Sequence, residues 1–246
     1  MSQSTEHPLM TAISVEGGKG PAQALAAVQI PRPVPGPGEI LIKVAAAGVN
    51  RPDIIQRLGF YPAPPGAPAT LGLEVAGEVV VAAGRWKVGD KVVVRPLDWC
   101  GECPACRAGH SHICMKLKFM GIDSIGALQE RWNVKARTLY KVPEGLSLRT
   151  AALIEPLAVA CHDVRIAELK KDEFALVMGG GPIGILIALV ARAAGARVLI
   201  SEINPYRIDF ARKAGFEVIN PQEKDLAEAV NAATGGAGAD VVFEVT

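Results

Sequence analysis

Four cysteines lie close together in residues 99–114, WCGECPACRAGHSHIC. Cys100, Cys103, Cys106 and Cys114 follow a CxxCxxCx7C spacing. Thiolates at such short spacings can converge on one point, and four of them complete the tetrahedron that Zn²⁺ prefers in structural sites. Because every position would be sulfur, none would remain for water or substrate. The spacing therefore predicts a structural zinc site, in a lobe over residues 98–116.

Two other uses of these cysteines stay open. A ferredoxin-type iron–sulfur run also begins CxxCxxC, but its fourth cysteine follows after about three residues and precedes a proline, whereas Met115 follows here. Disulfides require an oxidising compartment, and the opening MSQSTEHPLM has neither the basic start nor the apolar core of a signal peptide. We therefore expect a cytoplasmic protein. The fifth cysteine, Cys161, lies in an apolar helical pattern and is expected to be a buried, inert thiol.

A second group of residues with chemical meaning is the glycine-rich turn after the apolar run FALVM. Gly179, Gly181 and Gly184 form GxGxxG between an expected strand over 174–178 and an apolar helix from Ile183. A second expected strand, 197–201, ends at Glu202. The order strand, glycines, helix, strand and acid predicts a dinucleotide site.

Each part of this motif has a physical task. The first glycine permits a tight turn, the second lets pyrophosphate approach the backbone, and the third lets helix and strand pack closely. The helix N-terminus, with Pro182 and Ile183, would face the pyrophosphate. Glu202 would accept hydrogen bonds from the adenosine ribose and repel a 2′-phosphate, which favours NAD over NADP, although Arg207 would partly offset the repulsion. A βαβ unit that binds nothing remains the alternative.

The elements that must position these residues suggest an α/β protein of two domains. The chain has 246 residues, half of them hydrophobic, and 26 basic against 25 acidic residues, so it can bury a core and nothing indicates nucleic acid or an anionic membrane as partner. Short strands are expected over 11–15, 24–30, 39–49, 71–84 and 88–96, with a short helix from Asn50 or Pro52. Beyond Glu202, helix and strand patterns alternate twice more and supply one half of a doubly wound parallel sheet plus one strand.

The segments GVNRPD, GFYP, GLEVAGEV and VGDKV, within residues 10–94, resemble the opening of the medium-chain dehydrogenase/reductase superfamily in its zinc-free quinone oxidoreductase branch. The resemblance implies a β-rich, GroES-like catalytic domain over residues 1–155 and a truncated Rossmann domain over 156–246. In the zinc-dependent members, a cysteine stands where this chain has Asn50 and a histidine where it has Leu73. Neither residue offers zinc a suitable donor, so the resemblance argues against a catalytic zinc.

The same resemblance implies that Asn50, Asp53 and Tyr61 line the place where nicotinamide and a quinone or enone meet, with hydrogen-bond donors for a carbonyl oxygen. The alternative is structural: Asn50 and Asp53 would cap the short helix, and Tyr61 would pack over the proline loop. After Arg95 the chain resembles the zinc-containing polyol, threonine and alcohol dehydrogenases instead. Glu155 matches an acidic residue at or near their catalytic zinc, but without companions it is expected to form a hydrogen bond or salt bridge at the domain junction.

Three functions follow as hypotheses. The first is a zinc-free reductase that moves a hydride between nicotinamide and a carbonyl, enone or quinone. The second is a zinc-dependent alcohol or polyol dehydrogenase, and the third is a truncated or chimeric fragment that keeps its structural zinc without catalysis. For an enzyme we expect a small-molecule carbonyl, quinone or alcohol as substrate, no nucleic acid or membrane partner, and a homo-oligomeric state.

Overall fold

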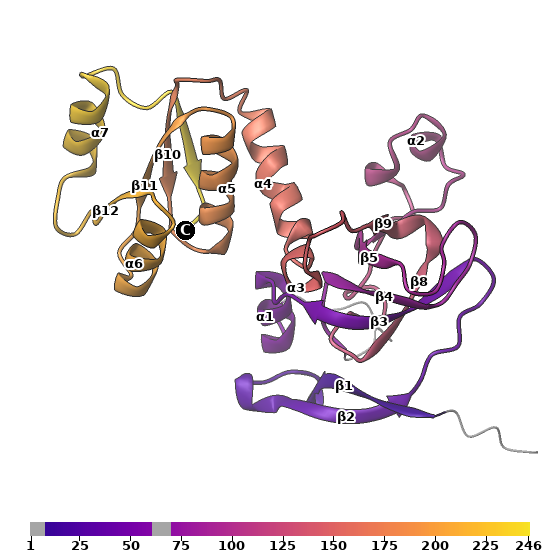
Figure 1. Ribbon diagram of the computed structural model, residues 1–246. Coiled ribbons are helices and arrows are strands. Elements are labelled where there is room, and N and C mark those ends of the chain that lie inside the picture. The colour runs from indigo at the N-terminus through magenta and orange to yellow at the C-terminus, as the bar shows by residue number, and fades with distance from the viewer. Residues whose placement is uncertain (1–7, 61–69) are drawn as a thin grey trace, which may run out of the picture. The chain divides into compact units, whose positions relative to one another are not determined.

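The computed structural model of the protein describes residues 8–60 and 70–246. The chain divides into two compact units, Met1–Ile154 and Glu155–Thr246 (Figure 1). The first unit is rich in β-strands and the second alternates strands with helices. The predicted α/β class, with a β-rich part followed by a Rossmann-like part, is confirmed.

The first unit is built on a five-stranded antiparallel sheet of order β8-β3-β4-β5-β9. A separate hairpin pairs β1 with β2, and helix α1 follows β3 directly. The strands of this unit, with α1 and α3, are β1 (Leu9–Val15), β2 (Leu25–Pro31), β3 (Glu39–Ala47), α1 (Arg51–Leu58), β4 (Val75–Val81), β5 (Lys91–Val94), β8 (Arg131–Lys135), β9 (Leu139–Lys141) and α3 (Leu148–Ala151).

Apolar residues on neighbouring strands form the core of this sheet. Ile40 and Ile42 alternate along β3 and pack with Val79 of β4, Val92 of β5 and Leu139 of β9. All five side chains are almost completely buried. Such alternation is typical of a sheet with one face against the core. The packed core supports the segments at the edges of the sheet.

The cysteine-rich segment forms a lobe that is closed by a short ribbon, in which β6 (Leu97–Asp98) pairs antiparallel with β7 (Lys118–Phe119). Between the two strands lie helix α2 (Pro104–Arg107) and the 3₁₀ helix η3 (Ser111–Ile113). Figure 1 shows α2 in the part of the lobe that extends away from the sheet. Residues of both strands of the ribbon thus fix the lobe at its base.

The second unit contains a four-stranded parallel sheet of order β12-β11-β10-β13. This is the strand order of one dinucleotide-binding half plus the first strand of the other. Its elements are α4 (Ile154–Ile166), β10 (Phe174–Met178), α5 (Pro182–Ala193), β11 (Arg197–Ser201), α6 (Pro205–Lys213), β12 (Glu217–Ile219), α7 (Leu226–Thr234) and β13 (Val241–Glu244).

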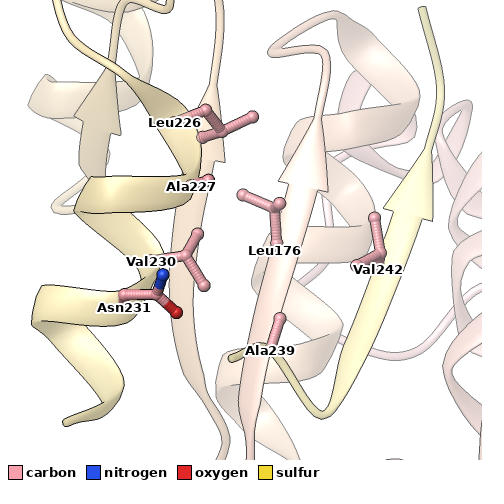
Figure 2. A pocket seen from close by; sticks show the side chains of 7 residues that line it. All are labelled: Leu176, Leu226, Ala227, Val230, Asn231, Ala239 and Val242. Atoms are coloured by element: carbon pink, nitrogen blue, oxygen red, sulfur yellow. The ribbon is translucent and has the colours of Figure 1, made fainter. Parts of the chain in front are cut away.

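Helices cover both faces of this parallel sheet. Along β10, Ala175 and Val177 belong to a cluster with residues of α4, α5 and α6, whereas Phe174 and Leu176 pack with Val230 of α7. An apolar groove of about 400 Å³ lies beside α7. Figure 2 shows the residues that line it: Leu176, Leu226, Ala227, Val230, Asn231, Ala239 and Val242. None of these residues can titrate, so the groove offers no group for acid–base chemistry.

Helix α4 departs from the sequence prediction at Cys161. The thiol is exposed, not buried, because Ala160 and Val164 form the packed side of the helix and Cys161 follows Ala160 on a different side. No helix in residues 8–60 or 70–246 is long and apolar enough to cross a membrane.

Candidate metal and cofactor sites

The four predicted cysteines of the lobe come together in one cluster. Their sulfur atoms all lie within 4.8 Å of one another, and the Sγ atom of Cys114 is 3.5 Å from that of Cys100 and 3.9 Å from that of Cys103. Tetrahedral zinc, with Zn–S bonds of about 2.3 Å, separates its sulfurs by about 3.8 Å. The cluster therefore fits a zinc ion with four sulfur ligands.

Backbone hydrogen bonds favour negative charge on some of these sulfurs. The N–H groups of Cys100 and Lys116 both donate to Cys114 Sγ at 3.3 Å. Hydrogen bonds from the N–H groups of Cys106 and Met115 lower the pKa of the Cys103 thiol to about 6, whereas burial raises the pKa of Cys106 to about 12. A bound divalent cation would favour the thiolate form of all four.

The two histidines of the lobe do not belong to this cluster. His110 and His112 are exposed, and their rings meet edge to face with centroids 5.9 Å apart. Among the described residues, the four cysteines form the one group of histidine, cysteine and acidic side chains placed to hold a metal ion.

The glycine turn lies between β10 and α5, at the carboxyl end of the parallel strands. Gly179 has a φ of 106°, which favours glycine, and a Cβ on Gly184 would lie only 1.9 Å from the Gly179 carbonyl oxygen. A Cβ on Gly181 would meet nothing closer than Arg207 at 3.7 Å. The first and third glycines therefore serve the fold, and the second leaves open space beside the start of α5. Pro182 and Ile183 form the first turn of that helix.

Glu202 follows β11 and lies against this turn. It is 6% exposed; its Oε2 accepts from Gly180 N–H at 2.8 Å, and its Oε1 accepts from the N–H groups of Ile203 and Asn204. Arg207 Nη1 lies 3.6 Å from Oε2. Burial acts to raise the pKa of Glu202, but the three backbone hydrogen bonds and the Arg207 charge outweigh it and hold the pKa below its usual value. Glu202 is thus an ionised acceptor at the end of β11.

Two residues of this arrangement were missed by the sequence analysis. Gly180 donates to Glu202, and a Cβ there would lie 3.2 Å from the Glu202 side chain. Asn204 caps α6 by accepting from the N–H groups of Tyr206 and Arg207, which sets Arg207 in the first turn, near Glu202. The run of three glycines and the Asn204–Pro205 pair, a cap followed by proline at the first helical position, were the available signals.

Asn50 and Asp53 come together at the start of α1. Asp53 is 3% exposed and accepts from Asn50 N–H at 2.8 Å and from Gly72 N–H at 3.0 Å. Burial outweighs these hydrogen bonds and raises its pKa. The contact with Asn50 is the helix cap that the sequence analysis gave as the structural alternative for Asp53. The hydrogen bond from Gly72 is an additional contact. The Asn50 side chain faces the Asp53 N–H in the same capping box, and its Nδ2 is buried with no hydrogen-bond partner in the described part of the chain.

The remaining predicted residues lie apart from these clusters. Tyr61 falls outside the described residues. Glu155, in the first turn of α4, belongs to the second unit, and burial raises its pKa. The hydrogen bond or salt bridge expected for Glu155 at the domain junction stays a prediction. Leu73 is buried and supplies no metal donor.

Comparisons with known proteins agree on the two halves of the chain. A family model described as the alcohol dehydrogenase GroES-like domain matches residues 36–144, and one described as zinc-binding dehydrogenase matches residues 182–246. The chain is 51% identical over 216 residues to 2-dehydro-3-deoxy-L-galactonate 5-dehydrogenase of Pseudoalteromonas atlantica, covering 86% of this chain and 63% of that protein.

Two further relatives extend the comparison. L-threonine 3-dehydrogenase of Pyrococcus abyssi is 38% identical, over 91% of this chain and 66% of its own length. The crystal structure of a zinc-binding dehydrogenase from Sinorhizobium meliloti bound to NADP has a TM-score of 0.85 at 30% identity, covering 98% of this chain and 70% of that one. The chain thus spans slightly less than two thirds of the two curated relatives.

Proposed function

Because this chain belongs to the medium-chain dehydrogenase/reductase superfamily, among its zinc-type alcohol dehydrogenases, we propose that it serves hydride transfer between NAD and a small carbonyl, enone or quinone substrate. The observation that carries the proposal is the contact of Glu202 with the glycine turn, at the carboxyl end of β10 and β11. In open parallel sheets this end of the strands is where dinucleotides bind. We assign residues 1–155 as the catalytic domain and 156–246 as part of the cofactor domain.

The nicotinamide ring would supply the hydride chemistry, and the chain would hold the other end of the cofactor. The N-terminus of α5, with Gly181, Pro182, Ile183 and Gly184, would face the pyrophosphate, since its free N–H groups and dipole favour an anion. The free lone pairs of Glu202 would accept the ribose hydroxyls. The carboxylate favours NAD, while Arg207 and the NADP-bound neighbour are reasons to test both cofactors.

Zinc has a structural role in this proposal. The four sulfurs of the lobe would occupy every coordination position of the ion, so no substrate would reach the metal. The resemblance places Asn50 and Leu73 where zinc-dependent members have ligands, and a leucine side chain binds no metal. We therefore propose one zinc per chain, and no complete catalytic zinc site.

In place of a catalytic zinc ion, Asn50 would polarise the carbonyl group of the substrate. Its Nδ2 is buried and makes no hydrogen bond to the described residues, so two amide hydrogens are available to a carbonyl oxygen. Holding such a donor ready in a dry site stabilises the charge that develops on oxygen during reduction. Tyr61 would add a second donor, and Asp53 would act indirectly, by fixing the start of α1.

A second candidate is a zinc-dependent alcohol or polyol dehydrogenase. It is favoured by the match to the zinc-binding dehydrogenase model and by the Glu155 carboxylate, whose pKa is raised by burial. Under this alternative Glu155 would bind a second zinc ion together with ligands that we have not identified.

Steady-state assays separate the two candidates. Our proposal predicts NADH oxidation with quinones or enones that persists after dialysis against a chelator strong enough to remove loosely bound zinc. Chelator-sensitive oxidation of alcohols or polyols, with no quinone activity, would replace it with the second candidate. We propose a cytoplasmic location because four of the cysteines are placed to hold a metal ion and not paired in disulfides. Size-exclusion chromatography with light scattering would test the proposed homo-oligomer.

A further inference from the structure

Arg137, which lies outside the lobe, makes three contacts with residues at the base of the lobe. Arg137 lies in the 3₁₀ helix η4 (Ala136–Thr138), between β8 and β9. Its Nη2 donates to Asp98 Oδ1 at 2.5 Å and to the Trp99 carbonyl oxygen at 2.5 Å. Its guanidinium carbon also lies 5.2 Å from the centroid of the Trp99 ring, within cation–π distance. A single side chain therefore contacts both residues that precede Cys100.

The segment that carries Arg137 is firmly fixed to the sheet. The Thr138 side chain is fully buried, and its carbonyl oxygen accepts from Arg95 N–H at 2.9 Å. The Trp86 indole N–H donates to the Ala136 carbonyl oxygen at 2.9 Å. Because its backbone is held on both sides of the side chain, Arg137 can act as a stationary anchor for the lobe.

The contact with Asp98 is stronger than an ordinary surface ion pair. The Asp98 side chain is only 16% exposed, and its other oxygen, Oδ2, lies 2.9 Å from Lys135 Nζ. Exposed ion pairs contribute little to stability, but a mostly buried carboxylate with a cation on each oxygen depends on keeping both. Asp98 is in β6, so this pairing secures one strand of the ribbon that closes the lobe.

The anchored residues lead directly into the cysteine cluster. Trp99 is bonded to Cys100, whose sulfur is one member of the cluster and whose N–H donates to the Cys114 sulfur at 3.3 Å. A shift of the Trp99 carbonyl would therefore move one ligand and, at the same time, a donor to another. Outer partners of this kind orient metal ligands and change affinity.

From these contacts we propose that Arg137 is a positioning residue for the metal lobe, which slows zinc release by holding Asp98 and Trp99 against the sheet. The inference rests on the proposed zinc site, but it concerns how long the ion is retained and not whether it binds. Arg137 itself touches no sulfur, so its effect must pass through Trp99 and Cys100.

The test is the rate at which zinc passes to a chromogenic chelator from the purified, zinc-loaded chain. We expect Arg137→Ala to release zinc about tenfold faster than the wild type, the effect of losing hydrogen bonds to charged groups. Arg137→Lys should be intermediate, because ammonium can pair with Asp98 but cannot bridge to Trp99 as a planar fork does. In the cobalt-substituted chain, the thiolate-to-cobalt absorption bands should shift in Arg137→Ala.

Arg85→Ala is the matched control. Arg85 also stacks on a tryptophan, Trp86, at 4.9 Å, but within residues 8–60 and 70–246 no hydrogen bond or ion pair joins it to the lobe. Equal release rates for wild type and Arg137→Ala, or equal acceleration in Arg85→Ala, would overturn the proposal. If Arg137→Ala does not fold, Asp98→Asn provides the same comparison, and an unchanged release rate there contradicts the proposal too. Wild-type zinc content is measured separately, so an empty site would refute the zinc proposal itself.

Discussion

The Glu202 carboxylate accepts a hydrogen bond from the backbone N–H of Gly180 at 2.8 Å. The two residues follow neighbouring parallel strands, β11 and β10, so the acid proposed to bind the ribose and the turn proposed to face the pyrophosphate are directly joined. The contact depends on the missing side chain of Gly180, since a Cβ there would crowd Glu202 at 3.2 Å.

Glu202→Gln should weaken NADH binding about tenfold, because the loss of a charged hydrogen-bond acceptor costs about 1.5–3 kcal/mol. NADPH binding should be unchanged or tighter, since the repulsion of a 2′-phosphate is removed while Arg207 remains. Fluorescence titration with each cofactor measures both constants. Glu217→Gln, at an exposed acid in β12, is the control, and equal weakening of NADH and NADPH would contradict the assignment of Glu202.

The lowered pKa of Glu202 predicts a pH dependence of stability. Since the folded-state pKa lies below the usual value of 4.5, the ionised carboxylate stabilises the folded chain above that pH, and this stabilisation is lost as the pH falls through the lowered pKa. Urea unfolding of wild type and Glu202→Gln should therefore show a difference in free energy that is largest near about pH 6 and shrinks towards about pH 3. A difference that grows on acidification would mean that the pKa is raised instead.

The glycines of the turn should separate stability from cofactor binding. Gly184→Ala places a Cβ 1.9 Å from a backbone oxygen, and we expect a loss of about 3 kcal/mol or more in the free energy of unfolding, at the upper end for overpacking. Gly181→Ala meets no atom closer than 3.7 Å, so the fold should persist while NADH affinity falls because the methyl group occupies the pyrophosphate space. Thermal unfolding and NADH titration of both variants decide the matter. If the two variants are equally stable, the assignment of Gly184 to folding and of Gly181 to cofactor binding is refuted.

Local sequence patterns were enough to predict much of this molecule. The cysteine cluster was predictable because all its ligands lie within one short loop, and the strand order of the second unit follows from the right-handed connection of successive parallel strands. Two hydrogen bonds could not be predicted from such local patterns, because each joins residues that are distant in sequence. They are the bond from Gly72 N–H to Asp53 and the bond from Arg137 to Asp98. Cys161 was misjudged for a different reason: an apolar helical pattern does not tell which side of α4 packs against a partner.

Asn50 and Asp53 should respond differently to removal of their side chains. Asn50→Ala should cost at most about 1 kcal/mol of stability, the loss of its side of the capping box, but should lower kcat/KM for quinone reduction by about 100-fold, as loss of one polarising donor does. Asp53→Ala should cost about 2 kcal/mol of stability, because a buried N–H group, of Gly72, and a half-buried one, of Asn50, lose their acceptor. Parallel kinetic and unfolding measurements test the pair. A stability loss in Asn50→Ala with full activity would show that Asn50 is only structural.

The cluster should lose its metal when one sulfur is replaced. Cys103→Ser removes a buried ligand, so zinc content should fall to near zero and the thermal unfolding temperature should drop, since metal binding stabilises a lobe with little apolar core of its own. Cys161→Ser, at the exposed thiol of α4, is the control and should change neither quantity. A Cys103→Ser variant with full zinc content would exclude the four-sulfur site.

Elemental analysis of zinc per wild-type chain tests the central claim most directly. The account predicts about one zinc, held in the four-cysteine cluster alone. That value should not change when Glu155 is replaced by Gln. A value of about two, reduced to one in Glu155→Gln, would contradict the account and establish a second zinc site at Glu155, as in a zinc-dependent alcohol dehydrogenase.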